Sequence, residues 1–144
     1  MRKILFVCTG NTCRSPMAEN IFRAKVKSRG YKEVRVASAG LMCYEGDEMS
    51  ENARLALKAM GIKAPRHRSR QFSLNMLEEY DLILTMTARH KAIIGDYDNV
   101  FTLAEFSGES DIPDPYGGDL NTYQMTAFEL ENALEKVINR LVLK

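Results

Sequence analysis

The stretch ILFVCTGNTCRSP, residues 4–16, decides the fold. It opens on four apolar residues, 4–7, which have the length and composition of a buried strand. A polar loop with one glycine follows, and Ser15 and Pro16 then predict a helix start, because serine is a favoured N-cap and proline a favoured first helical residue. Glu19 fits the first turn of such a helix. A strand that runs through a short loop into a helix indicates a βα unit of an α/β fold.

Short apolar runs alternate with longer amphipathic segments along the rest of the chain, a pattern typical of further βα units and a parallel sheet. We therefore expect a single domain, residues 1–144, with a four-stranded parallel sheet flanked by helices. Ligands of such open sheets bind beyond the carboxyl ends of the strands, where residues 8–15 would lie. The expected strands cover 4–7, 34–37, 81–86 and 100–103, the expected helices cover 15–29, 49–60, 88–94 and 123–143, and an irregular loop covers 107–119.

Composition excludes several classes of protein. No apolar run approaches the ~20 residues of a membrane span, and the apolar run 4–7 is too short for a signal peptide. A net charge of +1 argues against a large nucleic-acid footprint. Three cysteines, at positions 8, 13 and 43, do not make a disulfide framework, which favours a reducing compartment. We expect a cytoplasmic protein with neither nucleic acid nor membrane among its partners.

Residues 8–15, CTGNTCRS, place a cysteine and an arginine on either side of five residues. A loop of this length between a strand and a helix can curl so that its backbone N–H groups point inward, and the helix adds the positive end of its dipole. Such a ring suits a phosphate or another oxyanion. We expect Gly10 to supply the positive φ of the curl. The expected phosphate-binding residues are Thr9, Gly10, Asn11, Thr12, Cys13, Arg14 and Ser15.

The residue types in this loop point to phosphoryl chemistry. The loop field favours a thiolate, so we expect the pKa of Cys8 to lie below the ordinary ~8.5 and the cysteine to act as nucleophile. Arg14 can grip two phosphoryl oxygens with its planar guanidinium, in the transition state as well. Ser15 can donate a hydrogen bond to the departing sulfur, and Asn11 can hold the loop from outside. Asp114, between two prolines, is the candidate general acid.

Chance and core packing are the competing explanations for the pattern of Cys8, Arg14 and Asp114. A cysteine and an arginine six positions apart occur by chance, a cysteine that ends a buried strand is commonly an inert core residue, and Asp-Pro is a common surface turn. Here a strand, a glycine, a serine and a helix start occur together around the cysteine, and core packing accounts for none of the polar residues. The combination favours a catalytic cysteine with Asp114 as its acid.

Over essentially its whole length the chain resembles the low-molecular-weight protein tyrosine phosphatase family. The resemblance rests on residues 7–19, VCTGNTCRSPMAE, which look like the family's phosphate loop, on 38–40, SAG, which look like its second-strand exit, and on 114–116, DPY, which look like its acid loop. It implies a protein phosphatase whose partner is a phosphorylated protein. The implied roles are nucleophile forming a phosphocysteine for Cys8, phosphate ligand for Arg14, thiol partner for Ser15, and acid and then base for Asp114.

The resemblance also implies roles for residues that would otherwise be read as ordinary surface or core positions. His67 falls where the family has a histidine that supports the loop together with Asn11 and Ser38. Tyr44 and Tyr116 match aromatic positions that wall the substrate pocket. The implied redox pair is Cys8 and Cys13, which under peroxide would form a reversible disulfide that protects the nucleophile.

Two positions bear on the substrate. Thr12 stands where many tyrosine phosphatases of the family carry a bulkier aliphatic residue, and threonine resembles the bacterial protein-arginine phosphatases instead. Tyr116 is typical of the tyrosine phosphatases, although either substrate can stack on it. Thr87 also departs from the family, which often has aspartate there. The resemblance favours phosphoarginine slightly over phosphotyrosine.

Other functions remain as alternatives. An arsenate reductase shares the loop and the fold, but that resemblance requires two further cysteines for a disulfide relay, and this chain has none after Cys43. A non-catalytic phosphoprotein-binding module would need a disabled site, whereas Cys8, Arg14 and Asp114 are intact. No pair of cysteines has the spacing of a structural zinc site, and we expect neither a metal nor a cofactor.

Overall fold

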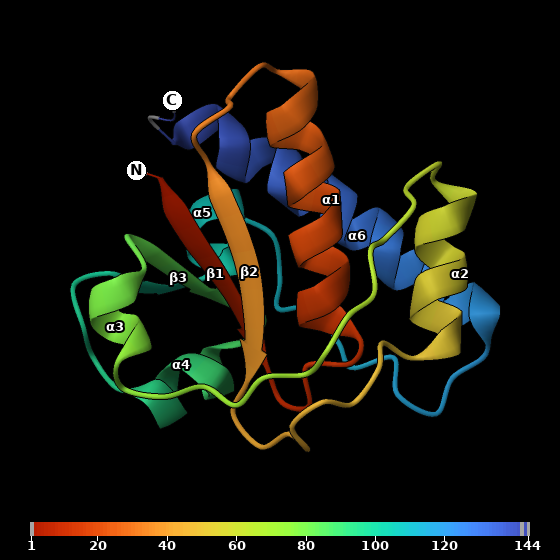
Figure 1. The fold of residues 1–144 in the computed structure, drawn as a ribbon, viewed down its shortest axis with the longest axis horizontal. Helices are drawn as coiled ribbons and strands as arrows, with labels where there is room; N and C mark the ends of the chain where they lie inside the picture. Colours follow the sequence, from red (N-terminus) through yellow and green to blue (C-terminus); the bar gives the residue numbers. More distant parts are fainter. Residues whose placement is uncertain (1, 142, 144) are drawn as a thin grey trace.

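The apolar run near the N-terminus forms the central strand of a parallel sheet. In the computed structural model, which describes residues 2–141 and 143, this strand buries five of its six residues. The order β2-β1-β3-β4, with every pair parallel, confirms the expected α/β sheet (Figure 1). The strands are β1 (Lys3–Cys8), β2 (Arg35–Gly40), β3 (Leu82–Thr85) and β4 (Val100–Thr102).

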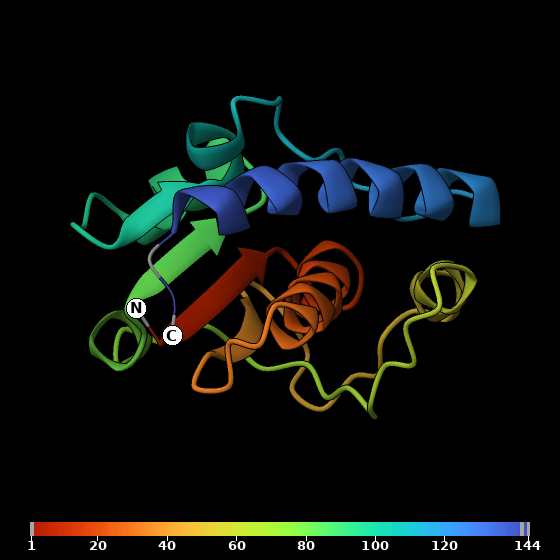
Figure 2. The ribbon, with the colours of Figure 1, turned by 90° about the horizontal axis from the view of Figure 1, so that it is seen from above.

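Helices cover both faces of this sheet. Figures 1 and 2 show α1 and α6 on one face, with α2 beside them and farther from the strands, and α3 with α4 toward the other face. The helices are α1 (Arg14–Ser28), α2 (Glu51–Ala59), α3 (Met76–Glu79), α4 (Ala88–Ile94), α5 (Leu103–Ser107) and α6 (Leu120–Arg140).

Alternation along β1 divides the core between the two faces. Ile4 and Phe6 pack with α1 and α6, whereas Leu5 and Val7 pack with α3 and α4. Phe6 meets Phe22 of α1 edge to face, with 5.6 Å between the ring centroids. Each fully buried side chain of this size contributes roughly 1.5–3 kcal/mol to stability. A strand covered on both faces explains why the run of apolar residues is unbroken.

The chain order of the sheet reverses at β1, whose two neighbours are the second and third strands. Loops from the carboxyl ends of neighbouring parallel strands meet at such a point. Here the amide of Leu41 donates to the carbonyl of Cys8, and the amide of Met42 donates to the carbonyl of Thr9, both at 2.9 Å. The exit of β2 therefore holds the start of the loop that follows β1.

The expected N-cap of α1 is wrong by two residues. The helix begins at Arg14, with Cys13 at the N-cap position and no side-chain capping bond, and its first turn contains no acidic residue. Ser15, the expected cap, lies inside the first turn because its hydroxyl contacts the sulfur of Cys8 instead. Glu19 lies one turn further along and accepts a hydrogen bond from Ser38.

Two short helices were not expected. α3 occupies four residues before β3, and α5 begins at Leu103, which had been expected to end a strand. A capping box between Thr102 and Glu105 starts α5 at that point. This local helix signal was missed because residues 100–103 were interpreted as one strand.

The final helix begins earlier than expected. α6 starts at Leu120 because Asp119 caps it, accepting from the amide of Thr122 at 2.9 Å. It ends at Arg140, and residue 142 of the expected range lies outside the described residues. Charged side chains recur along α6, and none of the helices in the described part of the chain is both long and apolar enough to cross a bilayer.

Candidate active site

The curl of the loop between β1 and α1 (residues 9–13) depends on Asn11 rather than on Gly10. Asn11 has φ +56°, whereas Gly10 is not in the positive-φ region, so the expectation for Gly10 is wrong. Asparagine tolerates the left-handed region better than most residues because its short polar side chain can bond locally. A Cβ on Gly10 would lie in ordinary contact, 3.7 Å from the hydroxyl of Thr12.

Asn11 is fully buried, and each of its polar atoms has a partner. Its amide nitrogen donates to the hydroxyls of Ser15 at 2.8 Å and Ser38 at 2.9 Å. Its side-chain oxygen accepts the backbone amide of Arg70 at 2.9 Å. The bonds reach β2 and the 67–71 segment, so they can offset the strain of the positive φ.

The backbone carbonyl of Asn11 is held from the same segment. His67 Nε2 lies 2.7 Å from this oxygen, and the Ser69 hydroxyl donates to it at 2.8 Å. The structure thus brings together His67, Asn11 and Ser38 in one network, through the Asn11 backbone and side chain. Ser69 was not identified from the sequence as part of this network. Its only indication in the sequence was that it lies two positions after His67.

Cys8 ends β1 with its sulfur buried against the first turn of α1. Its Sγ lies 2.9 Å from the hydroxyl of Ser15, which accepts from Asn11. The single hydrogen of that hydroxyl can point to the sulfur or to the carbonyl of Ala39, 3.4 Å away. Burial raises the pKa of the Cys8 thiol, while the hydroxyl and amide of Ser15, the charge of Arg14 and the amide of Asn11 lower it. The expected lowering is wrong in direction, because burial outweighs these groups.

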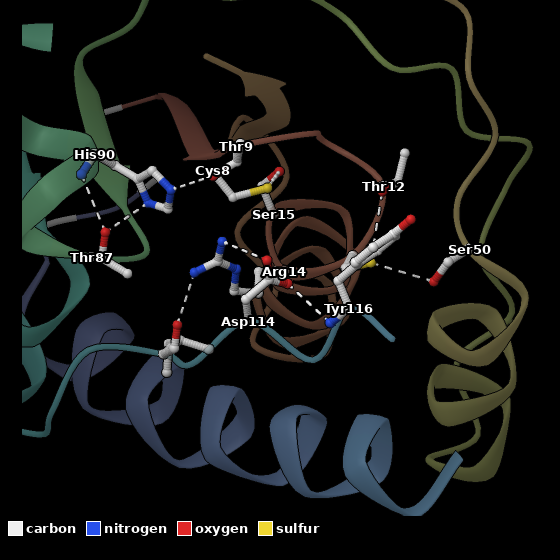
Figure 3. A network of polar contacts seen from close by, with 12 residues as sticks. Cys8, Thr9, Thr12, Arg14, Ser15, Ser50, Thr87, His90, Asp114 and Tyr116 are labelled. Carbon is white, nitrogen blue, oxygen red and sulfur yellow. Dashed lines mark hydrogen bonds and ion pairs between the residues drawn. The ribbon is translucent and has the colours of Figure 1, made fainter. Parts of the chain in front are cut away.

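Arg14 lies under the loop that precedes α6. Its Nη1 donates to the carbonyl of Ile112 at 3.0 Å, and its Nη2 lies 3.7 Å from Oδ2 of Asp114. Arg14 is buried, whereas the Asp114 side chain is 53% exposed and accepts the amide of Tyr116 at 3.0 Å. Figure 3 shows Cys8, Arg14 and Asp114 gathered at the N-terminal end of α1.

Three segments meet around Cys13. Its thiol lies 3.3 Å from the hydroxyl of Tyr123 on α6 and 3.6 Å from that of Ser50, the N-cap of α2. Burial and the neighbouring Cys13 raise the pKa of Tyr123 to about 12. The amide of Ser50 donates to the carbonyl of Thr12 at 2.9 Å. Cys8, Cys13 and Cys43 are free thiols.

Both tyrosines expected to wall the substrate pocket are largely exposed. Tyr44 and Tyr116 are 82% and 81% exposed, so most of each ring is free to contact another molecule. Tyr44 comes from the loop after β2 and Tyr116 from the loop before α6.

The arrangement supports one kind of chemistry. A buried sulfur faces a helix N-terminus whose first amides have no intrahelical partner, and a guanidinium lies beside it. A half-exposed carboxylate lies within ion-pair distance of that guanidinium. These groups can bind a tetrahedral dianion, attack it and exchange a proton with the departing group.

Comparisons with known proteins agree with this geometry. A family model described as "Low molecular weight phosphotyrosine protein phosphatase" matches residues 3–144. The protein-arginine-phosphatase of Geobacillus stearothermophilus is 40% identical over 146 residues, which cover 96% of this chain and 95% of that protein.

Two solved structures are similar throughout. The low molecular weight protein tyrosine phosphatase from T. tengcongensis has a TM-score of 0.91 and 43% identity, covering 98% of this chain and 100% of that one. A YwlE arginine phosphatase, solved as a cysteine-to-serine mutant with a phosphorylated active-site serine, has a TM-score of 0.90 and 40% identity, covering 96% and 95%.

Proposed function

Since this chain belongs to the low molecular weight phosphotyrosine protein phosphatase family, we propose that it hydrolyses phosphoarginine in proteins, with phosphotyrosine as the alternative substrate. The family membership makes it a cysteine-dependent protein phosphatase. The observation that carries the site assignment is the contact of Cys8 with Ser15 beside the pair of Arg14 and Asp114.

The first step transfers the phosphoryl group to the protein. The deprotonated sulfur of Cys8 attacks phosphorus in line with the departing atom, and the P–N or P–O bond breaks toward that atom. Asp114 gives it a proton, so neither an unprotonated guanidine nitrogen nor a phenolate has to leave. Arg14 and the inward amides hold the phosphoryl oxygens as their charge spreads in the transition state.

The second step releases phosphate. Asp114, now ionised, takes a proton from a water molecule that attacks the phosphocysteine, and the P–S bond breaks with its electron pair returning to sulfur. Ser15 donates its hydrogen bond to the thiolate as it leaves, as the 2.9 Å contact allows. The phosphoserine in the cysteine-to-serine mutant of the YwlE relative supports a covalent intermediate at this position.

The preference for phosphoarginine rests on Thr12. Its side chain lies in the phosphate loop, with its hydroxyl 3.7 Å from the sulfur of Cys13, too long for a strong hydrogen bond. That hydroxyl is free to orient a phosphoguanidinium or the attacking water, and the small side chain packs a phenyl ring poorly. Tyr44 and Tyr116 can stack on either substrate.

Parallel hydrolysis of phosphoarginine and phosphotyrosine peptides tests this preference. Thr12→Val removes the hydroxyl at nearly constant volume, and Thr12→Ile adds bulk, so the two variants separate the effects. We expect the wild type to prefer phosphoarginine and both variants to shift toward phosphotyrosine, Thr12→Ile more. A wild type that prefers phosphotyrosine, with little change in either variant, would make this an ordinary tyrosine phosphatase.

A phosphoprotein-binding module is the alternative from another class, because the same loop can bind phosphate without turnover. Cys8→Ser distinguishes the two: a phosphatase loses turnover and keeps phosphate binding, whereas a binding module hydrolyses nothing even as the wild type. Phosphate or another oxyanion is in both cases the ligand of the loop.

We further propose that Cys8 and Cys13 act as a redox pair in the cytoplasm. Peroxide oxidises the Cys8 thiolate to a sulfenic acid and releases hydroxide, and the Cys13 thiol then displaces water from it to close a disulfide. Three free thiols support a reducing compartment. In Cys13→Ser, excess peroxide can oxidise the sulfenic acid of Cys8 further to a sulfinic acid, which thiols do not reduce, so this variant is expected to recover less activity with dithiothreitol than the wild type. Full recovery of the variant after excess peroxide would contradict the pair.

A further inference from the structure

His90 is a buried histidine beside the phosphate loop that the two steps above do not use. It lies in the first turn of α4 and exposes 5% of its surface. Its Nε2 lies 2.9 Å from the hydroxyl of Thr9, the residue after Cys8, and its Nδ1 lies 3.0 Å from the hydroxyl of Thr87. The ring therefore joins the loop after β3 to the loop after β1 (Figure 3).

Thr87 decides which ring nitrogen carries the proton. Its hydroxyl oxygen already accepts the backbone amide of His90 at 3.2 Å, as the N-cap of α4. A hydroxyl has one hydrogen, and donation to Nδ1 uses it. In the reverse arrangement the oxygen would accept twice, and its hydrogen would have no acceptor among residues 2–141 and 143. The arrangement that satisfies the Thr87 hydrogen within the protein has Nδ1 accepting from Thr87 and Nε2–H donating to Thr9.

Burial, more than the surrounding charges, keeps the ring neutral. Burial, the charge of Arg14 from α1 and that of Arg89 lower the pKa of His90, and Asp111 and Asp114 from the loop before α6 oppose them. The result is a pKa of about 4. At neutral pH the ring is then an imidazole with one N–H group to donate.

We propose that His90 is a positioning residue for the reaction, an inference that rests on the proposed function: its Nε2–H holds the Thr9 hydroxyl and fixes the first turn of the phosphate loop beside Cys8. The amides of Leu41 and Met42 already hold the carbonyls of Cys8 and Thr9 from the side of β2. With His90 on the side of β3, both neighbours of β1 anchor the residue after the nucleophile. Loop amides held in this way need less reorganisation in the transition state.

The same geometry gives a reason for threonine rather than aspartate at position 87. A carboxylate can only accept, so it cannot donate to Nδ1 of His90. Thr87→Asp is therefore expected to place a proton on Nδ1 and to raise the pKa of His90. Thr87→Ser keeps the hydroxyl and is expected to leave the ring proton on Nε2.

Nitrogen-15 NMR of the imidazole groups tests the tautomer without any turnover. The chain has two histidines, and His90→Gln leaves only the signals of His67, which assigns both. We expect the His90 ring to show a protonated Nε2 and a bare Nδ1 from pH 5 to pH 8. A proton on Nδ1 in the wild type, or titration near the ordinary ~6.5, would overturn the inference.

Hydrolysis of para-nitrophenyl phosphate tests the effect on catalysis, whatever the natural substrate. His90→Asn removes the donor to Thr9, and Thr9→Val removes its acceptor at nearly constant volume. Each is expected to lower kcat/KM about 2- to 10-fold, the worth of one net hydrogen bond, and the double variant is expected to lose no more than one single variant. His90→Gln can still reach Thr9 with a side-chain N–H and is expected to recover most of the loss. Additive losses, or no recovery in His90→Gln, would contradict the role.

A destabilised variant far from the loop controls for folding. Thr102→Ala removes the side-chain cap of α5 and so lowers stability, and it is expected to keep wild-type kcat/KM while folded. An equal loss of kcat/KM in Thr102→Ala would show that the His90 effect is one of stability. If the wild type hydrolysed no phosphate ester, the proposed function would fail. The affinity for inorganic phosphate would then be compared among the wild type, His90→Asn, Thr9→Val, their double variant and His90→Gln, and this comparison would decide whether His90 positions Thr9.

Discussion

At the scale of single residues, the reactivity of Cys8, the proposed nucleophile, depends on opposing effects. Burial raises the pKa of Cys8, and the groups that counter it, Ser15 and Arg14 with the amide of Asn11, all belong to the loop and its helix. A raised pKa keeps the Cys8 thiol protonated to a higher pH. The fraction of Cys8 present as thiolate therefore increases as the pH rises toward that pKa. Each loop donor therefore shifts the pH at which the sulfur becomes reactive.

Replacing Ser15 by alanine tests this balance. The hydroxyl lowers the pKa of Cys8, so its loss is expected to raise that pKa further and to move the pH dependence of Cys8 alkylation by iodoacetate to higher pH. Ser28→Ala, at the far end of α1, is the matched control and should leave the curve in place. A curve for Ser15→Ala that coincides with the wild type would show that the 2.9 Å contact does not stabilise the thiolate.

The proposed acid has its own signature. Asp114→Asn is expected to lower kcat by roughly 10²- to 10⁴-fold for alkyl phosphates and far less for para-nitrophenyl phosphate, whose leaving group needs little protonation. The exposed Asp96, in the loop that leads into the amino end of β4, gives the matched control Asp96→Asn. Equal losses across leaving groups would remove Asp114 from the role of acid.

At the scale of elements, the exit of β2 shapes the proposed phosphate loop between β1 and α1. Gly40, the last residue of β2, is bonded on both sides, with its amide donating to Arg70 and its carbonyl accepting from Phe72. A Cβ at this position would lie 2.7 Å from the carbonyl oxygen of Thr9 and 3.0 Å from the amide nitrogen of Asn11. The strand and the loop can pack this closely only because residue 40 has no side chain.

Gly40→Ala is therefore expected to destabilise the protein by about 1–3 kcal/mol and to weaken phosphate binding, because backbone atoms must shift. Gly30→Ala is the control: φ at Gly30 is +77°, yet no atom lies within 4 Å of its Cβ position. It should cost stability without affecting phosphate affinity. Chemical denaturation and phosphate titration measure the two effects. Unchanged affinity in Gly40→Ala would mean that the loop tolerates the shift.

At the scale of the whole molecule, a helix and a loop that are distant in sequence contact the residues that follow β1. Tyr123 of α6 contacts Cys13 across 110 positions, and the carbonyl of Ile112 holds Arg14 across 98. α6 itself is joined to α1 by Lys25, which pairs with Glu131 and Glu135. Because the loop is built from contacts of this range, ligand binding and global folding are coupled.

Phosphate is therefore expected to raise the thermal stability of the protein. Binding to the folded state alone adds about 2.7 kcal/mol at a phosphate concentration of 100 times Kd. Arg14→Ala should abolish the increase in Tm, while Arg54→Ala, which removes an exposed ion pair with Glu51, should retain it. An equal increase of Tm in wild type and Arg14→Ala would place the phosphate elsewhere.

Much of this molecule could be predicted from patterns within short segments. The unbroken apolar run 4–7 indicated a central strand, and the cysteine, arginine and helix start after it indicated an anion-binding loop. Such signals are local, because a strand, a loop and the first turn of a helix follow one another in the chain. The fold class and the family were predictable for that reason.

The tertiary structure alone decided the features that depend on distant neighbours. The positive φ falls on Asn11 rather than Gly10 because β2 and the 67–71 segment supply partners for its side chain and backbone. The pKa of Cys8 rises because the fold buries its sulfur, and His90 reaches Thr9 across 81 positions. Spacing along the chain does not encode such contacts, because the topology of the sheet determines which loops meet.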